Sequence, residues 1–136
     1  MPMNDLPILS ALRTKMHWHQ ERQRVLAENV SNSDTPNFRP RDLVEPTFDR
    51  GGAPTAGTMG NLPMARTSAT HISASGAADS FNNDGGRGAF ITRPAGNAVN
   101  LEEQMLKVSA NQMDYAAATS LYSRSLGLIK TAIGRR

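Results

Sequence analysis

The chain has 136 residues, of which 38% are hydrophobic, 5% aromatic and none cysteine, and its formal net charge at pH 7 is +3. The length suits a single domain, and the lack of cysteine excludes a disulfide framework and a thiolate metal site. The charged residues are dispersed along the chain without a basic block, which argues against a surface that concentrates nucleic acid.

The first predicted element is a helix over residues 5–32. Asp5 can cap it, with Leu6 and Pro7 in the opening turn, where a missing backbone N–H costs nothing. Inside it, a mainly apolar set recurs at alternating steps of three and four residues: Leu9, Leu12, Met16, His19, Gln23, Leu26 and Val30. A mean step of 3.5 residues places this set on one narrow face that suits packing against another helix.

The second predicted element is a turn followed by an irregular middle, over residues 33–99. Pro36 pushes Thr35 out of the helical region, and Asn37 tolerates a left-handed backbone, so a tight turn is expected before Phe38. Short extended structure is possible at 39–45. Residues 50–97 hold nine of the eleven glycines and cannot bury much apolar surface, although patches at 62–65 and 89–92 could form a short β-hairpin.

The third predicted element is a helix over residues 100–134. Asn100 is a good N-cap, Glu102 and Glu103 suit the first turn, and Gly134 suits the end. Its regular stripe alternates steps of four and three: Leu101, Met105, Val108, Gln112, Tyr115, Thr119, Tyr122, Leu126, Ile129 and Ile133. Gln112 is a polar member that could set register or partner choice.

The expected fold is therefore one mainly α-helical domain over residues 1–136. Two long terminal helices form a coiled-coil-like layer, and a Gly/Pro-rich middle joins them. Because each stripe is narrow, it needs a partner helix, either from the other end of the chain or from another subunit.

No catalytic chemistry is expected. His17 and His19 lie on different faces of the first helix, whereas a helical metal pair needs a spacing of three or four residues. The sequence has no Gly-rich phosphate loop, nucleophile elbow or dinucleotide fingerprint. We therefore expect no catalytic residues, no cofactor and no metal site.

Residues 23–38, which read QRVLAENVSNSDTPNF, resemble the N-terminal signature of the bacterial flagellar rod, hook and hook-associated proteins. The segments 96–105 and 111–115 are similar to the C-terminal part of the same family. The residues that carry the motif turn are Asn29, Asn32, Asp34, Thr35, Pro36, Asn37 and Phe38. Asn37 stands where the family usually has glycine, and Phe38 where it has tyrosine.

The resemblance implies a structural subunit of the flagellar basal body that is not an enzyme. The short chain favours the proximal rod over the distal rod and hook, and the sister rod protein FlgC is the close alternative. The implied partners are further copies of the chain, FliE, FlgC, distal rod proteins and the flagellar type III export apparatus, with no nucleic acid and no membrane insertion. The implied location is the periplasmic rod, reached without a cleaved signal peptide, and both stripes would serve as the assembly interface.

A second hypothesis from another class is a coiled-coil regulatory or nucleic-acid-binding protein. The sequence pI of about 9.8 supports it. It predicts a basic face beside the helical stripe and salt-sensitive DNA binding, and the dispersed charge argues against both.

Overall fold

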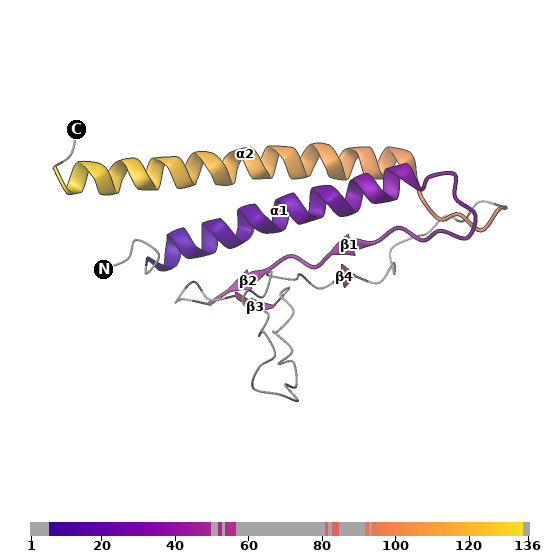
Figure 1. The fold of residues 1–136 in the computed structure, drawn as a ribbon, viewed down its shortest axis with the longest axis horizontal. Helices are drawn as coiled ribbons and strands as arrows, with labels where there is room; N and C mark the ends of the chain where they lie inside the picture. Colours follow the sequence, from indigo (N-terminus) through magenta and orange to yellow (C-terminus); the bar gives the residue numbers. More distant parts are fainter. Residues whose placement is uncertain are drawn as a thin grey trace, which may run out of the picture.

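The computed structural model describes residues 6–49, 52, 54–56, 81, 83–84, 92 and 94–134. Two long helices dominate it, α1 (Pro7–Ser31) and α2 (Leu101–Ala132). They lie antiparallel along the long axis of the molecule, close together where the chain leaves α1 and enters α2, and further apart towards the termini (Figure 1). The prediction of a mainly helical fold with two long terminal helices is confirmed.

The ends of the helices follow simple capping rules. Leu6 occupies the N-cap position of α1 without a side-chain cap, and Pro7 occupies the first turn, so α1 begins two residues later than predicted. Asp5, the expected cap, lies outside the described residues. The Asn100 side chain accepts hydrogen bonds from the backbone N–H groups of Glu102 and Glu103, at 3.1 and 3.5 Å, so the predicted N-cap of α2 is confirmed.

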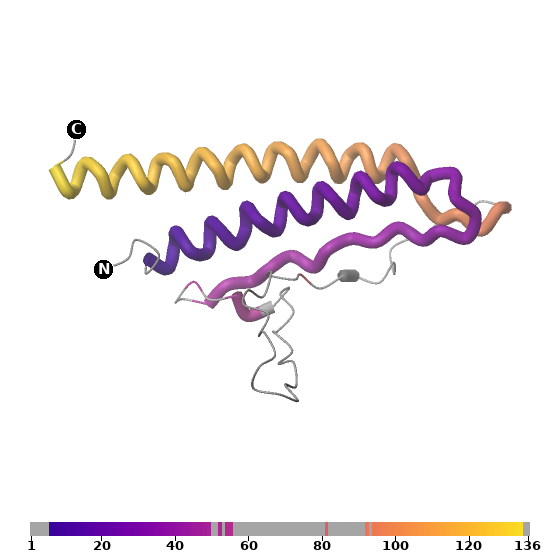
Figure 2. Tube along the Cα trace, in the orientation of Figure 1, coloured from indigo at the N-terminus to yellow at the C-terminus, as the bar shows by residue number. Residues whose placement is uncertain are grey.

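After α1 the chain turns and runs back along that helix as an extended segment (Figure 2). Two short strands lie in this return segment, β1 (Asp42–Leu43) and β2 (Thr47–Phe48). β1 pairs antiparallel with β4 (Asn83–Asp84), and β2 with β3 (Pro54–Ala56), giving two sheets of two strands each. The extended structure expected at 39–45 thus includes β1. The hairpin expected between 62–65 and 89–92 lies outside the described residues, apart from Thr92.

One buried apolar cluster of the described residues lies between α1 and the return segment. Trp18 and Val25 of α1 pack in one buried cluster with Leu43 and Phe81. The Trp18 indole Nε1–H donates a hydrogen bond to the Val44 carbonyl oxygen at 2.8 Å. One face of α1 is therefore covered by the return segment, which leaves another face for α2.

Neither of the two described helices is long and apolar enough to cross a membrane.

Candidate assembly interface

The stripe predicted on α1 is turned away from solvent along its whole length. Leu9, His19 and Leu26 are buried, and Leu12, Met16, Gln23 and Val30 are half-buried. The seven residues share the inner side of α1, where hydrogen bonds from His19, Gln23 and Asn29 reach α2.

The inner face of α2 is the side that contacts α1, and the stripe predicted on α2 coincides with it only in part. Val108, Tyr115, Thr119, Tyr122, Leu126 and Ile129 are half-buried, whereas Leu101, Met105, Gln112 and Ile133 are exposed. The residues that α2 buries fully are Gln104, Asn111 and Ala118, which follow each other at seven-residue steps. The sequence pattern favoured the apolar Met105 over Gln104, its neighbour, but amides occupy the inner positions because α1 offers them hydrogen-bond partners.

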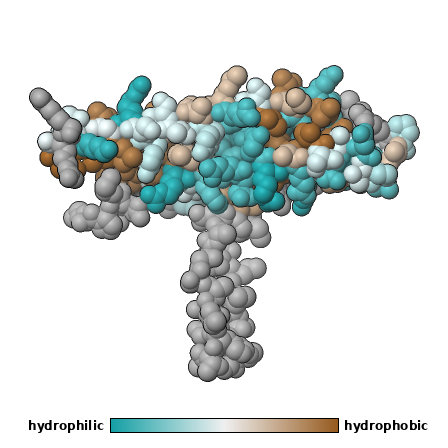
Figure 3. Space-filling model, turned by 45° about the horizontal axis from the view of Figure 1, so that its top comes forward, coloured by the Kyte–Doolittle hydropathy of each residue, from teal (hydrophilic) through white to brown (hydrophobic). Residues whose placement is uncertain are grey.

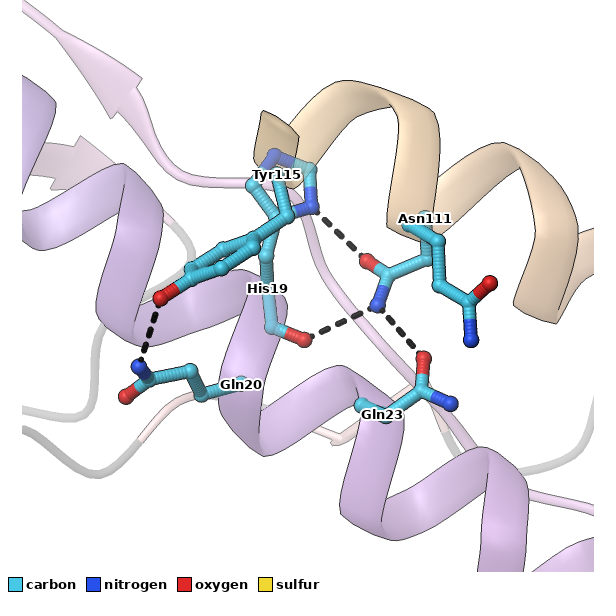
Figure 4. Close-up of a pocket in the computed structure, with 6 residues that line it drawn as sticks. His19, Gln20, Gln23, Asn111 and Tyr115 are labelled. Atoms are coloured by element: carbon cyan, nitrogen blue, oxygen red, sulfur yellow. Dashed lines mark hydrogen bonds between the residues drawn. The ribbon is translucent and has the colours of Figure 1, made fainter. Parts of the chain in front are cut away.

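The buried amides of α2 join the two helices at two levels. At the first, the Asn29 amide donates to Gln104 Oε1 at 3.0 Å. At the second, the Asn111 amide nitrogen donates to the His19 carbonyl at 2.9 Å and to Gln23 Oε1 at 3.0 Å (Figure 4). Asn111 Oδ1 lies 2.7 Å from His19 Nδ1, so this oxygen accepts and Nδ1 carries the proton.

A pocket of about 390 Å³ opens beside the second level (Figure 4). Its lining is rich in amides and comprises His19, Gln20, Gln23, Asn111, Gln112 and Tyr115. The Gln20 amide spans the two helices by donating to the Tyr115 hydroxyl at 3.1 Å. This lining can form hydrogen bonds but contains no carboxylate and no Lys or Arg, so it offers polar contacts rather than a nucleophile activated by a charged partner.

The turn that follows α1 is held by one buried side chain, Asn97. Its amide donates to the carbonyl oxygens of Asn32 and Thr35, at 3.0 and 2.7 Å, and its Oδ1 accepts from the Val99 backbone N–H at 2.8 Å. The Thr35 hydroxyl also donates to Asn32 Oδ1 at 3.1 Å. Asn97 thereby holds the residues just before α2 against the turn that follows α1. We call this set of contacts the Asn97 clamp, and the turn that it holds the clamped turn.

The predicted left-handed residue in this turn is confirmed, because Asn37 has a φ of 59°. Its backbone N–H donates to the Ala95 carbonyl at 3.2 Å. Gly96 also has a positive φ, 78°, and a Cβ there would collide with Asn37 Oδ1. Two positive-φ residues therefore meet where the two halves of the chain cross. Among the other predicted motif residues, Asp34 is exposed and Phe38 is half-buried.

Substitutions at Asn37 should separate backbone strain from side-chain contacts. Asn37→Gly should leave the free energy of unfolding nearly unchanged, because glycine adopts positive φ freely. Asn37→Val should lower it by about 1–2 kcal/mol, because a β-branched residue is strained there. Urea unfolding of both variants, followed by circular dichroism, measures the difference, and equal stability of the two would contradict the assignment.

Asp42 connects the return segment to both helices. Its carboxylate accepts a bidentate pair of hydrogen bonds from the Arg22 guanidinium of α1, at 2.9 Å from Nε and 3.0 Å from Nη2. Asp42 Oδ2 also lies 3.6 Å from Lys107 Nζ of α2. Burial by itself raises the pKa of Asp42, but the hydrogen bond and charge of Arg22, the Leu43 backbone N–H and the charge of Lys107 outweigh it and hold the pKa below 3.8. Arg22 also lies over the Trp18 ring, 5.1 Å from its centroid.

Asp42→Asn should lower the free energy of unfolding at pH 7 by about 2 kcal/mol, because it removes charge-assisted hydrogen bonds that are half-buried. A pKa lowered in the folded state stabilises the fold above the ordinary value of 3.8, and this contribution is lost as the pH falls through the folded pKa. The difference in the free energy of unfolding between the wild type and Asp42→Asn should therefore be largest at pH 7 and should shrink below about pH 4.

The matched control is Glu45→Gln, because Glu45 forms a solvent-exposed ion pair with Lys15 at 3.3 Å. It should change stability by less than about 0.5 kcal/mol at either pH. A gap for Asp42→Asn that stays constant from pH 7 to pH 3 would show that the charge of Asp42 is not what stabilises this junction.

The residues that hold α1, α2 and the return segment together within the chain are largely outside the predicted set. Gln104, Asn111, Asn97 and Asp42 are polar, and an apolar periodicity does not select them. The seven-residue spacing of Gln104 and Asn111 is the one signal in the sequence that could have identified the inner face. The carbonyls that Asn97 bonds belong to residues 65 and 62 positions earlier, and the Arg22 partner of Asp42 is 20 positions earlier, so no local pattern marks either residue.

Comparison with known proteins confirms the resemblance seen in the motif. The chain is 28% identical over 120 residues to the flagellar basal body rod protein FlgB of Cereibacter sphaeroides, covering 84% of each chain. It is 29% identical over 126 residues to the protein of the same name from Agrobacterium fabrum, covering 88% of this chain and 87% of the relative. No family model matches the chain.

Proposed function

We propose that this chain, which resembles the flagellar rod protein FlgB along most of its length, is a structural subunit of the proximal rod of the flagellar basal body. The observation that carries the proposal is the outer surface of α2. After α1 has covered the inner face, large apolar side chains remain exposed on α2: Leu101, Met105, Leu106, Met113, Leu121, Leu128 and Ile133. Figure 3 shows groups of apolar residues on the surface towards the two ends of the long body, with hydrophilic residues between them.

An exposed apolar surface of this kind is typical of a protein that assembles with others. α2 is also nearly uncharged in its central part, since Lys107 and Asp114 are the only charged residues between 104 and 123. A helix that is apolar on several sides is suited to burial on several sides. We therefore assign the outer face of α2 to contacts with further copies of the chain and with neighbouring rod subunits, among them FliE, FlgC and distal rod proteins.

The antiparallel helix pair suits a torque-transmitting role. Helices of 25 and 32 residues lie antiparallel, side by side, along the length of the molecule (Figure 1). The hydrogen bonds of Asn97 restrict bending of the turn where the chain passes between them. A chain without cysteine can also pass unfolded through the flagellar type III export apparatus, because it forms no disulfide crosslinks. Its destination would be the periplasmic part of the basal body.

The experiment replaces an outer-face residue in the bacterium that carries the gene. Met105 belongs to the predicted interface and is 59% exposed, so Met105→Asp should leave the helix pair folded but place a charge in the subunit contact. We expect stable, exported protein, no incorporation into purified basal bodies and loss of swimming.

The matched control is Ala27→Asp, an equally charged change at an exposed position of α1. It should incorporate and support swimming. Normal incorporation of Met105→Asp would remove the outer face of α2 from the interface, and basal bodies that assemble fully without this protein would contradict the rod assignment itself.

A further inference from the structure

The buried face of α2 is polar where a helix pair is usually apolar. Gln104 and Asn111 are each 2% exposed, and Ala118 follows at the same seven-residue step. Leucine at the two amide positions would bury more apolar surface and require no hydrogen-bond partner. The amides therefore add little stability that apolar residues could not supply.

Each buried amide instead needs a particular hydrogen-bond partner on α1. Gln104 meets Asn29, and Asn111 meets both the side chain and the carbonyl of His19 as well as Gln23. A buried amide left without a partner keeps its desolvation penalty and gains no hydrogen bond in return. Each level of contact therefore favours one alignment of the helices and penalises others.

We infer that Gln104 and Asn111 fix the register of α1 against α2. Because the helices are antiparallel, a slip of one heptad would bring Asn111 level either with Met16, which is apolar, or with Asn29. In the second case Gln104 would pass beyond the end of α1, which is at Ser31. In neither register do both amides keep their partners, whereas leucines at the same places would tolerate both.

The register has a consequence for the molecular surface. Sliding α2 along α1 would break the hydrogen bonds that hold Asn97, just before α2, to the turn after α1. It would also move the exposed apolar residues of α2 relative to Asp42, which is bound to Arg22 of α1. The amides thus determine where the outer apolar residues stand on the molecule. The register is a property of the single chain, whether or not the chain builds a rod.

The test measures the register directly. The chain has no cysteine, so nitroxide labels attached at Ala27→Cys and Ser123→Cys report one distance between α1 and α2 by pulsed electron spin resonance. Both positions are exposed. Dilution with unlabelled protein removes distances between molecules, and the full-length chain with its native amides should give a single narrow distribution.

Asn97→Ala first removes the contacts that hold the entry to α2 and, with the native amides in place, should keep the single distance. The triple variant His19→Leu/Gln104→Leu/Asn111→Leu is made in this Asn97→Ala background. It should remain helical by circular dichroism and show a second population, displaced by about 10 Å, the length of one heptad. Gln112→Leu is the matched control, because it changes an exposed amide next to Asn111 and should leave the single distance unchanged.

A single distance in the triple variant, equal to that of the unsubstituted chain, would overturn the inference. Should the triple variant lose its helical signal, the milder Gln104→Met/Asn111→Met variant in the same background decides by the same measurement: a second distance supports the inference and an unchanged single distance overturns it.

Discussion

Trp18→Ala should lower the free energy of unfolding by about 3–5 kcal/mol, a large part of the stability of a domain of this size. Trp18 is 2% exposed and is the largest member of the small cluster that holds the return segment on α1. Its removal leaves a cavity beside Val25, Leu43 and Phe81 and deprives the Val44 carbonyl of its donor. The measurement is urea unfolding of the full chain followed by circular dichroism.

Trp18→Phe separates the contribution of ring packing from that of the hydrogen bond to Val44. It keeps most of the ring volume but cannot donate to Val44, so it should cost less than half as much as the alanine variant. A loss below about 1 kcal/mol for Trp18→Ala would show that the return segment is not held by this cluster.

Asn97→Ala should cost about 3 kcal/mol, although it removes only three heavy atoms from the core. The side chain is 2% exposed, and its loss leaves the Val99 N–H without its acceptor. It also removes one of the two hydrogen bonds that each of the Asn32 and Thr35 carbonyls accepts, the other coming from the backbone N–H of Thr35 and of Phe38. Each of the three hydrogen bonds lost contributes about 1 kcal/mol. The Tm from circular dichroism and the urea midpoint should both fall.

Asn100→Ala is the appropriate comparison, because it removes another side-chain cap only three residues away. It frees two N–H groups at the exposed start of α2 and should cost about 1 kcal/mol. Equal effects of the two variants would mean that Asn97 acts as an ordinary cap and not as the clamp between the two halves of the chain.

The sequence predicted the helices well because their signals are local. The alternating apolar steps, Pro7 in the first turn, the Asn100 cap and the turn at Pro36 all act between residues a few positions apart. The left-handed Asn37 was predictable for the same reason, since its conformation follows from the residue type and the preceding proline.

The inner face of α2 was predicted less well because it depends on residues elsewhere in the chain. Val108, Tyr115, Tyr122 and Ile129 belong both to the predicted stripe and to the half-buried residues, but the exposed Met105 was chosen over the buried Gln104. A buried glutamine is favourable only when a partner such as Asn29 stands opposite, 75 positions earlier in the chain. Periodicity measures hydrophobicity along one helix and carries no information about such a partner.

The sequence by itself thus determined that two long helices form, where they start and end to within about two residues, and that a rigid turn follows the first. The tertiary structure alone decided that the two stripes meet within one chain, that amides fill the inner positions of α2, and that Asp42 and Asn97 tie the return segment and the turn in place. The physical reason is that helix formation and capping are set by neighbours in sequence, whereas the burial of a polar group is set by whatever the fold places beside it.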